Sequence, residues 1–284
     1  MNFVTPLRYP GGKGRLGPWL AGLMRHNQIS GGWYVEPYAG GAGAALYLLM
    51  QGCVSHIVIN DVDPVIYAFW SAVLNDNERF VKLVSETSLT MDEWHRQRVI
   101  LSNPEKYETT AVGFAAFFLN RTNRSGILSA GVIGGKNQNG PYKIDARYNK
   151  PELCERIKYV GSMRKHISIY GLDALDLVEK INDQMPDKSL VYFDPPYFKK
   201  GNQLYRNYYN PEDHAHISEA VCKLQKPWVV TYDNCLPIKE LYSKAKSAEF
   251  SLHYSTHRAR PRATEAMFYG NLDLHEAPFL SRKR

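Results

Sequence analysis

The segment from Ser189 to Tyr197 constrains the fold more than any other part of the chain. Residues 190–193 are apolar, with β-branched and aromatic side chains, as in a central parallel strand covered on both faces. Pro195 and Pro196 stop the strand, because neither can donate a hydrogen bond to a sheet. Pro195 also favours an extended Asp194 and holds its carboxylate at the strand's carboxyl end. Open α/β sheets bind ligands at this edge, so the segment predicts an α/β sheet with a functional site at Asp194.

The residues around Asp194 suit an amino group attached to an aromatic ring. One N–H of such a group could bond to the Asp194 carboxylate and the other to the Pro195 carbonyl, which would make the nitrogen nucleophilic. The ring of Tyr197 could stack on the ring of the acceptor. The alternative interpretation is a rigid Pro-Pro turn in which Asp194 is only a cap, since short motifs also match by chance.

Two glycine-rich segments lie in the first part of the chain. The first places Gly11, Gly12 and Gly14 around Lys13, without the spacing of a Walker phosphate loop. The second, residues 33–46, predicts a short strand, a turn at Gly40, Gly41 and Gly43, and an apolar helix that ends near Gly52. Such a turn lets the backbone approach a ligand closely, although helix packing alone could also demand these glycines.

Acidic residues follow two further predicted strands. Asp61 ends the strand 56–61, about one βα unit after the glycine turn, as in folds where this residue bonds ribose hydroxyls. Asp173 follows the strand 166–170. Asp63 and Pro64 instead indicate the cap and the first residue of the next helix. The pattern predicts polar side chains gathered at one edge of the sheet.

The middle of the chain has a different character. Residues 76–120 indicate helices, with Phe114, Phe117 and Phe118 as core, and residues 121–149 form a basic, glycine-rich segment whose one acidic residue is Asp145. A long irregular segment of this charge could contact nucleic acid, or it could be a solvated insertion. Two more basic stretches, residues 198–209 and 257–262, could do the same, while His214 and His216 are expected to be exposed.

Charge and cysteine usage exclude several classes of protein. A formal net charge of +7 favours a polyanionic partner, although basic surfaces also serve solubility alone. The four cysteines are scattered, which argues against a zinc site or a disulfide framework. No stretch approaches the ~20 apolar residues of a membrane span, so a soluble cytoplasmic protein is expected.

With these features in place, the sequence resembles the S-adenosylmethionine-dependent DNA adenine-N6 methyltransferases over nearly its whole length. Four motifs carry the resemblance in the family's order: Tyr9-Pro-Gly-Gly-Lys13, Glu36-Pro-Tyr-Ala-Gly-Gly-Ala-Gly43, Asn60-Asp61 and Asp194-Pro195-Pro196-Tyr197. They are similar to the family's N-terminal cofactor motif, glycine motif, ribose-binding turn and catalytic motif. Asn123-Arg-Ser-Gly126 and Gly134-Gly135 stand where the best-known members carry a different loop, so no DNA target sequence is transferred.

The resemblance implies a Rossmann-like, doubly wound, mostly parallel α/β sheet with an inserted helical and loop domain for target recognition. The catalytic domain would comprise residues 1–70 and 166–284, and the inserted domain residues 71–165. The cofactor would be S-adenosylmethionine and the partner double-stranded DNA, in which an adenine is rotated out of the helix and methylated directly on its exocyclic amine. No metal is implied. A homodimer and a restriction endonuclease partner stay open, and a nucleoid-associated protein of a bacterium or phage is expected.

The resemblance also implies three groups of site residues. The catalytic group is Asp194, Pro195, Pro196 and Tyr197. The cofactor-binding group is Tyr9, Lys13, Glu36, Pro37, Tyr38, Gly40, Gly41, Gly43, Asp61, Asp173 and Asp194. The DNA-binding group is Arg121, Arg124, Ser125, Lys136, Lys143 and Arg147.

Other functions compete with this interpretation. Methylation of cytosine N4, RNA adenine or protein glutamine uses similar acceptors, although Asp194 and the basic segment favour adenine in DNA. No cysteine lies in a nucleophile-like loop, which disfavours cytosine-C5 chemistry. A catalytically silent DNA-binding protein would not need Asp194 or the glycines. A nicotinamide-dependent oxidoreductase would share the glycine turn but leaves Asp-Pro-Pro-Tyr unexplained.

Overall fold

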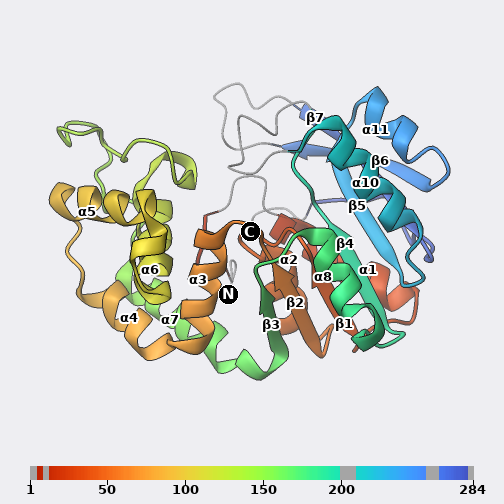
Figure 1. Cartoon of the computed structure of the whole chain (residues 1–284), viewed down its shortest axis with the longest axis horizontal. Helices are drawn as coiled ribbons and strands as arrows, with labels where there is room; N and C mark the ends of the chain where they lie inside the picture. The colour runs from red at the N-terminus through yellow and green to blue at the C-terminus, as the bar shows by residue number, and fades with distance from the viewer. Residues whose placement is uncertain (1–4, 9–12, 199–208, 254–261, 281–284) are drawn as a thin grey trace. The chain divides into compact units, whose positions relative to one another are not determined.

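The computed structural model describes residues 5–8, 13–198, 209–253 and 262–280, and the chain divides into two compact units (Figure 1). Unit 1 takes in Lys13–Asp63 and Tyr170–Arg284, and unit 2 takes in Val4–Gly12 and Pro64–Ile169. The predicted insertion, residues 71–165, falls within unit 2. Among the described residues, no helix combines the length and the apolar character needed to cross a membrane.

Seven strands form one sheet in the order β3-β2-β1-β4-β5-β7-β6. Their bounds are β1 Trp33–Glu36, β2 His56–Asn60, β3 Ile167–Tyr170, β4 Ser189–Phe193, β5 Trp228–Asp233, β6 Lys246–His253 and β7 Arg262–Gly270. β1 pairs parallel with β2 and β4, β4 pairs parallel with β5, and β7 runs antiparallel between β5 and β6. The predicted α/β fold with a mostly parallel, doubly wound sheet is therefore confirmed. The strand order reverses between β1 and β4, where such sheets bind their ligands.

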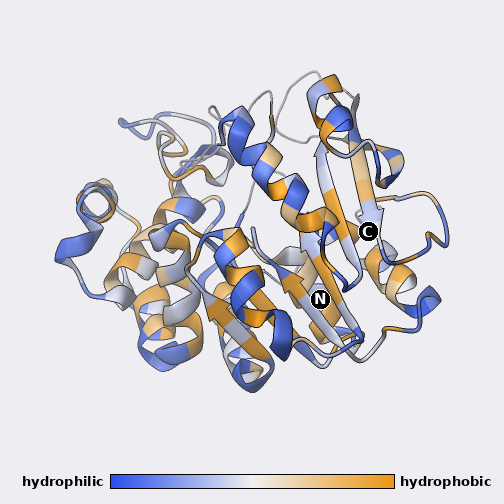
Figure 2. Ribbon diagram, turned by 45° about the vertical axis from the view of Figure 1, so that its right-hand side comes forward, coloured by the Kyte–Doolittle hydropathy of each residue, from blue (hydrophilic) through white to orange (hydrophobic). Residues whose placement is uncertain are grey.

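Helices cover the sheet of unit 1. In chain order they are η1 Lys13–Leu16, α1 Gly17–His26, α2 Gly43–Met50, α8 Ala174–Ile181, η5 Asn182–Gln184, α10 Pro211–Cys222 and α11 Leu236–Leu241. Apolar residues of α8, α10 and α11 pack in one core with alternate strand residues, among them Val35, Val191, Phe193, Val230 and Tyr232. Tyr34 and Tyr192 point to the opposite face, with ring centroids 6.2 Å apart. Figure 2 shows hydrophobic residues along the strands and on one side of the helices.

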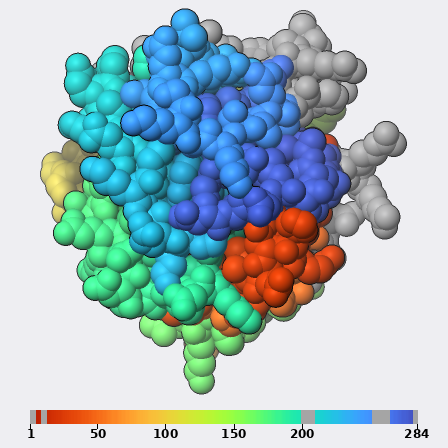
Figure 3. Space-filling model, turned by 90° about the vertical axis from the view of Figure 1, so that its right-hand side faces the viewer, coloured from red at the N-terminus to blue at the C-terminus, as the bar shows by residue number. Residues whose placement is uncertain are grey.

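The segment after β7 returns to the first helix of unit 1. Figure 3 shows the residues that follow β7 in the sequence, in dark blue, beside α1, in orange-red. The Trp19 indole N–H donates to the Glu276 carbonyl at 3.3 Å. Asn27 and Asp273 exchange two hydrogen bonds of 2.8 Å. The two ends of the described sequence in unit 1 are thus joined by polar contacts.

Unit 2 is helical. Its elements are α3 Pro64–Asn75, α4 Asn77–Glu86, α5 Met91–Ser102, η2 Pro104–Lys106, α6 Thr109–Thr122, η3 Arg124–Gly126, α7 Lys150–Ser162 and η4 Arg164–His166. The phenylalanines predicted as core are buried: Phe117 stacks on Phe69 at 6.1 Å, and Phe114 lies edge-on to Phe80 at 6.2 Å. α3 begins at Pro64, as the sequence predicts.

Candidate active site

β4 delivers Asp194 to the carboxyl edge of the sheet. Every residue of β4 is buried, and Asp194 follows it with 16% of its side chain exposed. The next three residues in the sequence, Pro195, Pro196 and Tyr197, are buried. The strand therefore holds a partly open carboxylate on a rigid and otherwise closed support.

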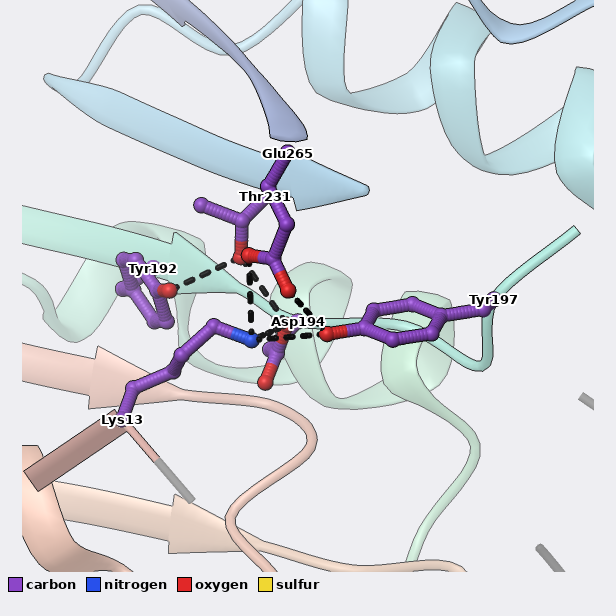
Figure 4. A network of polar contacts seen from close by, with 6 residues as sticks. All are labelled: Lys13, Tyr192, Asp194, Tyr197, Thr231 and Glu265. Carbon is purple, nitrogen blue, oxygen red and sulfur yellow. Dashed lines mark hydrogen bonds and ion pairs between the residues drawn. The ribbon is translucent and has the colours of Figure 1, made fainter. Parts of the chain in front are cut away.

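Lys13 reaches this carboxylate from η1. Its side chain is 2% exposed, and Nζ lies 2.9 Å from Asp194 Oδ1, 3.4 Å from Glu265 Oε2 and 3.2 Å from the Tyr197 hydroxyl (Figure 4). Burial alone would lower the pKa of Lys13, but the carboxylates of Asp194 and Glu265 raise it well above its ordinary value. Lys13 is therefore an ammonium ion paired with two carboxylates.

A chain of hydroxyl groups fixes the other side of Asp194. The Thr231 hydroxyl donates to Asp194 Oδ1 at 2.9 Å, and the Tyr192 hydroxyl lies 2.8 Å from Thr231 Oγ1. Because the one proton of Thr231 goes to the carboxylate, Tyr192 is the donor to Thr231. Among the described residues, both hydrogen bonds to Asp194 end on Oδ1, and neither involves Oδ2.

Tyr197 is turned toward this cluster. Its hydroxyl donates a hydrogen bond to Glu265 Oε1, and Lys13 Nζ lies 5.4 Å from the centroid of its ring. Figure 4 shows the side chains of Tyr197, Lys13 and Glu265 converging beside Asp194. The structure thus links the last residue of the Asp-Pro-Pro-Tyr motif to β7.

Sequence reasoning missed Tyr192, Thr231 and Glu265 as members of this site. Tyr192 and Thr231 sit inside apolar strands and read as core. The sequence does carry a signal for Glu265, an acidic residue directly before the apolar run Ala266, Met267 and Phe268, and the structure shows it 1% exposed. A carboxylate in such a strand needs a partner of opposite charge, which for Glu265 is Lys13.

The glycine turn lies at the neighbouring strand end. Gly40 has φ 46° and Ala42 has φ 47°, so two residues of the turn adopt left-handed backbone. The Gly40 N–H donates to Asp61 Oδ2 at 3.0 Å, and the Asp63 N–H donates to Asp61 Oδ1 at 2.9 Å. A Cβ placed on Gly14 would lie 3.5 Å from the backbone of Gly43. The structure therefore brings both glycine motifs together and ties the turn to Asp61.

Asn60 joins three strand ends beneath this turn. Its Nδ2 donates to the carbonyls of Pro37 and Leu172, both at 2.9 Å, and its Oδ1 accepts from the Leu172 N–H at 2.9 Å. Because Pro37 follows β1 and Leu172 follows β3, a single amide fixes the loops after β1, β2 and β3. The Asn60-Asp61 motif thus has a structural task besides any contact with a ligand.

The remaining predicted cofactor residues lie around the same edge. Glu36 is buried and accepts from the Ala45 N–H at 3.3 Å, and Asp173 Oδ1 caps α8 through the Leu175 N–H at 2.8 Å. The Tyr38 hydroxyl lies 2.9 Å from that of Tyr209. Burial, followed by the nearby Asp194 charge, raises the pKa of Glu36 to about 8. Tyr9 lies outside the described residues, as do residues 199–208 and 257–261 of the two other basic stretches.

The basic segment of unit 2 has a defined course in the structure. Arg124, Ser125, Lys136, Lys143 and Arg147 are exposed, and Ser125 has φ 58°. Asn123 is buried, accepts from the Trp94 indole at 2.7 Å and donates to the carbonyls of Ile127 and Leu128. Buried asparagine amides therefore replace regular hydrogen bonding in this segment.

Arg121 differs from the other basic residues of the segment. It lies in the last turn of α6, and within the described residues its buried Nε has no hydrogen-bond partner. Burial, followed by the charges of Arg8 and Arg156, lowers the pKa of Arg121 to about 10. The side chain is thus held among like charges.

The expectation that His214 is exposed is wrong, whereas His216 is exposed. His214 Nδ1 lies 2.9 Å from the Tyr232 hydroxyl, and its ring centroid lies 5.2 Å from that of Phe198. The reason is helical periodicity, because His214 shares its face of α10 with buried Ile217, Ser218 and Val221.

Comparisons with known proteins cover most of the chain. A family model described as D12 class N6 adenine-specific DNA methyltransferase matches residues 9–259. Type II methyltransferase M.MjaIII of Methanocaldococcus jannaschii is 27% identical over 210 residues, which cover 68% of this chain and 70% of that protein.

Two solved structures are also similar. One is a proposed RNA methyltransferase of Pyrococcus horikoshii, with a TM-score of 0.43 and 10% identity over 93% of this chain and 84% of that one. The other is a proposed class I S-adenosylmethionine-dependent methyltransferase of Listeria monocytogenes, with a TM-score of 0.38 and 10% identity over 93% of this chain and 61% of that one.

Proposed function

The chain belongs to the D12 class of N6 adenine-specific DNA methyltransferases, and we propose that Asp194 and the residues around it form its catalytic site. The enzyme transfers the methyl group of S-adenosylmethionine to the exocyclic amine of adenine in DNA. The observation that carries the proposal for the site is the placement of Asp194, a partly exposed carboxylate at the end of β4 whose Oδ1 is held by Lys13 and Thr231.

The residues at the glycine turn fit the cofactor. Left-handed backbone at Gly40 and Ala42 and the close approach of Gly14 to Gly43 give a tight turn at the sheet edge, where the backbone can approach a ligand closely. The surrounding acceptors suit a ligand that carries positive charge and hydroxyl groups. We propose that the cofactor is held by Glu36, Pro37, Tyr38, Gly40, Gly41, Gly43, Asp61 and Asp173, together with Lys13, Asp194 and Tyr9.

The mechanism that we propose follows from the orientation of Asp194. When bound, S-adenosylmethionine supplies an electrophilic methyl group on a positively charged sulfur. Lys13 and Thr231 occupy Asp194 Oδ1, so Oδ2 accepts a hydrogen bond from the adenine amine and raises its nucleophilicity. The carboxylate also stabilises the positive charge that develops on the nitrogen during transfer.

The backbone behind Asp194 completes the acceptor site in this proposal. Pro195 and Pro196 have no N–H, so this stretch presents carbonyl oxygens, and the Pro195 carbonyl accepts the second N–H of the adenine amine. Tyr197 packs beside the base, and the Lys13 and Glu265 contacts of its hydroxyl fix the position of its ring. Rotating the adenine out of the duplex costs a few kcal/mol, which DNA binding must supply.

Residues 71–165 serve target recognition in this proposal, with residues 1–70 and 166–284 as the catalytic domain. The support is the exposed basic set Arg124, Lys136, Lys143 and Arg147, with Ser125 among them, on a segment fixed by buried asparagines. Arg121 adds a positive charge whose buried Nε has no hydrogen-bond partner in the described part of the chain. Phosphate groups of DNA suit such charges.

Two partners beyond DNA remain part of the proposal. We propose that a restriction endonuclease of the same specificity accompanies the enzyme in its host, supported by the name of the Type II methyltransferase M.MjaIII. We also propose that the enzyme can act as a homodimer, as the sequence interpretation left open. Sedimentation of the purified chain with and without duplex DNA tests the dimer.

One experiment tests the catalytic site. The purified chain is incubated with S-adenosylmethionine and duplex DNA, and N6-methyladenine is measured by nucleoside mass spectrometry. We expect Asp194→Ala to retain cofactor binding by calorimetry and to lose methyl transfer by at least about 100-fold, since its contact with the amine strengthens in the transition state. Asp187→Ala, which removes an exposed carboxylate before β4, is the matched control. Near-normal transfer by Asp194→Ala would contradict the site.

A further inference from the structure

Three strands and η1 bring one ammonium group and two carboxylates together in unit 1. Lys13 comes from η1, Asp194 follows β4, Thr231 belongs to β5, and Glu265 belongs to β7. The side chains of Lys13 and Glu265 are 2% and 1% exposed, whereas that of Asp194 is 16% exposed. The two carboxylates therefore differ: Asp194 can face a substrate, and Glu265 faces only the protein.

A lysine beside a catalytic carboxylate creates an electrostatic problem. The Asp194 carboxylate stabilises the developing cation because of its negative charge, but the Lys13 ammonium 2.9 Å away offsets that charge. A neutral Lys13–Asp194 pair would bind the amine as a weak dipole. Glu265 Oε2, 3.4 Å from the same Nζ, supplies a second negative charge, so the cluster as a whole keeps one net negative charge.

Glu265 also orients a second member of the motif. The Tyr197 hydroxyl donates to Glu265 Oε1, and Lys13 Nζ lies 3.2 Å from the same hydroxyl. The two oxygens of Glu265 thus hold two different partners, the ring that follows the catalytic prolines and the cation beside the catalytic carboxylate.

We propose that Glu265 is a positioning residue for methyl transfer, whose carboxylate balances the charge of Lys13 and orients Tyr197, so that Asp194 meets the adenine amine as an anion. This inference rests on the proposed catalytic role of Asp194. Glu265 itself touches neither substrate nor cofactor in this proposal. Its effect should therefore appear in the rate of transfer and not in the binding of either ligand.

The first test replaces Glu265 by its isosteric neutral counterpart. We expect Glu265→Gln to lower the single-turnover rate of methyl transfer by about 10-fold to about 100-fold, less than the loss of a direct contact, with little change in the KM for DNA. The matched control is Glu249→Gln, which removes an exposed carboxylate from the neighbouring strand β6 and should leave the rate unchanged. A wild-type rate in Glu265→Gln overturns the inference.

The second test separates charge balance from packing. In the double variant Lys13→Met with Glu265→Gln, only Asp194 remains charged, and the net negative charge of the cluster is restored. With cofactor at saturation, we expect the double variant to transfer methyl faster than Glu265→Gln alone, a non-additive result. If the double variant is no faster, Glu265 acts only through packing and the inference is overturned.

Nuclear magnetic resonance of labelled lysine gives a readout that does not depend on turnover. The titratable groups that face Lys13 are Asp194, Tyr192 and Tyr197 from β4 and the residues behind it, Glu265 from β7, and Glu36 from β1. Removing the Glu265 charge should lower the pKa of Lys13 measurably, while Glu249→Gln should not. An unchanged lysine titration in Glu265→Gln would show that the two groups are not coupled and would overturn the inference.

A misfolded variant and a failure of the proposed role of Asp194 can each be distinguished from a failure of this inference. If Glu265→Gln does not give a folded protein, Glu265→Asp keeps the charge, withdraws it by one methylene from Lys13, and should give an intermediate rate. A wild-type rate in a folded Glu265→Asp would then overturn the inference. The proposed catalytic role of Asp194 is overturned if the wild-type chain does not methylate adenine or if Asp194→Ala transfers methyl normally. Transfer that requires Asp194 but not Glu265 overturns this inference alone.

Discussion

Burial raises the pKa of two carboxyl groups beside the glycine turn, Glu36 to about 8 and Asp61 to about 7. In Glu36 the Asp194 charge acts in the same direction, while the Ala45 N–H and Lys13 act against it. Glu36 is therefore mostly protonated at neutral pH in the free chain. A positively charged ligand at this turn favours the ionised form, so ligand binding and proton release are coupled at this residue.

We expect the affinity for S-adenosylmethionine to rise as pH increases from 6 toward about 8 and to level above it, because protonated Glu36 must lose its proton on binding. Glu36→Gln should remove this part of the pH dependence. Calorimetric titration of both proteins over the same pH range makes the comparison, and the ionisation of the cofactor's own amine cancels because both proteins share it. Equal pH profiles would contradict the assignment.

Glu36 should also make the stability of the cofactor-free chain depend on pH. A carboxyl group whose folded pKa lies above its ordinary 4.5 contributes stability at low pH that is lost as pH rises through the folded value of about 8. Both proteins are compared by thermal denaturation without cofactor between pH 4.5 and about pH 8. We expect the melting temperature of Glu36→Gln to fall less over this range than that of the unchanged protein. A parallel loss in both proteins would mean that Glu36 ionises normally in the folded chain.

We expect Arg121 to lower the stability of the free chain and to strengthen its binding to DNA. Its buried Nε lacks a hydrogen-bond partner in the described residues, and Arg8 and Arg156 lie close enough to lower its pKa. Arg121→Met should therefore raise the melting temperature of the free chain, because it removes a buried charge from like neighbours. The same change should weaken DNA binding of all sequences alike and lower the salt slope of affinity by about one unit.

Arg79→Met is the control for this charge, since Arg79 is exposed and pairs with Glu108 in the same unit. We expect it to change neither the melting temperature nor the salt slope by a comparable amount. A fall in the melting temperature of Arg121→Met with unchanged DNA affinity would make Arg121 a structural residue.

At the scale of elements, the segment from η3 to α7 depends on single amide side chains. Asn123 is fully buried and holds the Trp94 indole and two carbonyls of the segment. Asn123→Ala leaves these groups without a partner, at about 1 to 3 kcal/mol for each that stays buried. We expect denaturant unfolding to show a loss in this range and hydrogen exchange to speed up at residues 124–131. Asn103→Ala, at the exposed end of α5, should change little.

The strands near the centre of the sheet could be predicted from sequence because their residues are buried on both faces. β1, β2, β4 and β5 all read as short apolar runs that end in polar residues. β6 was missed, since its exposed residues and edge position break the apolar pattern. The course of residues 121–149 was also beyond prediction, because hydrogen bonds between the side chains of Asn120, Asn123 and Gln138 and the backbone define it.

The candidate site was predicted only in part, for a similar reason. Asp194, Lys13 and Tyr197 belong to local motifs that a sequence displays directly. Thr231 and Glu265 join them through the pairing of β4 with β5 and of β5 with β7, which no local pattern reveals. The direct ion pair of Lys13 with Asp194 likewise required the positions of η1 and β4 in the folded chain.

For the whole molecule, the division into two units predicts where the cofactor acts. Every described residue that we propose to hold the cofactor belongs to unit 1, and the basic residues that we propose for target recognition belong to unit 2. Saturating S-adenosylmethionine at 100 times its Kd should stabilise unit 1 by about 2.7 kcal/mol. We expect slower hydrogen exchange in β1, β2 and β4, and unchanged exchange in α4 and α6. Equal protection of α4 and α6 would contradict a cofactor site whose described residues all lie in unit 1.

The ion-pair cluster also bears on how the protein is made. Lys13 precedes every described strand and Glu265 lies on β7, the last of them, so a ribosome has synthesised almost all of the printed sequence before these two charges can meet. A nascent chain that stops before β7 would carry Lys13 and Asp194 without their third partner. Such fragments would lack the proposed positioning carboxylate, so efficient methyl transfer would depend on translation having passed the codon for Glu265.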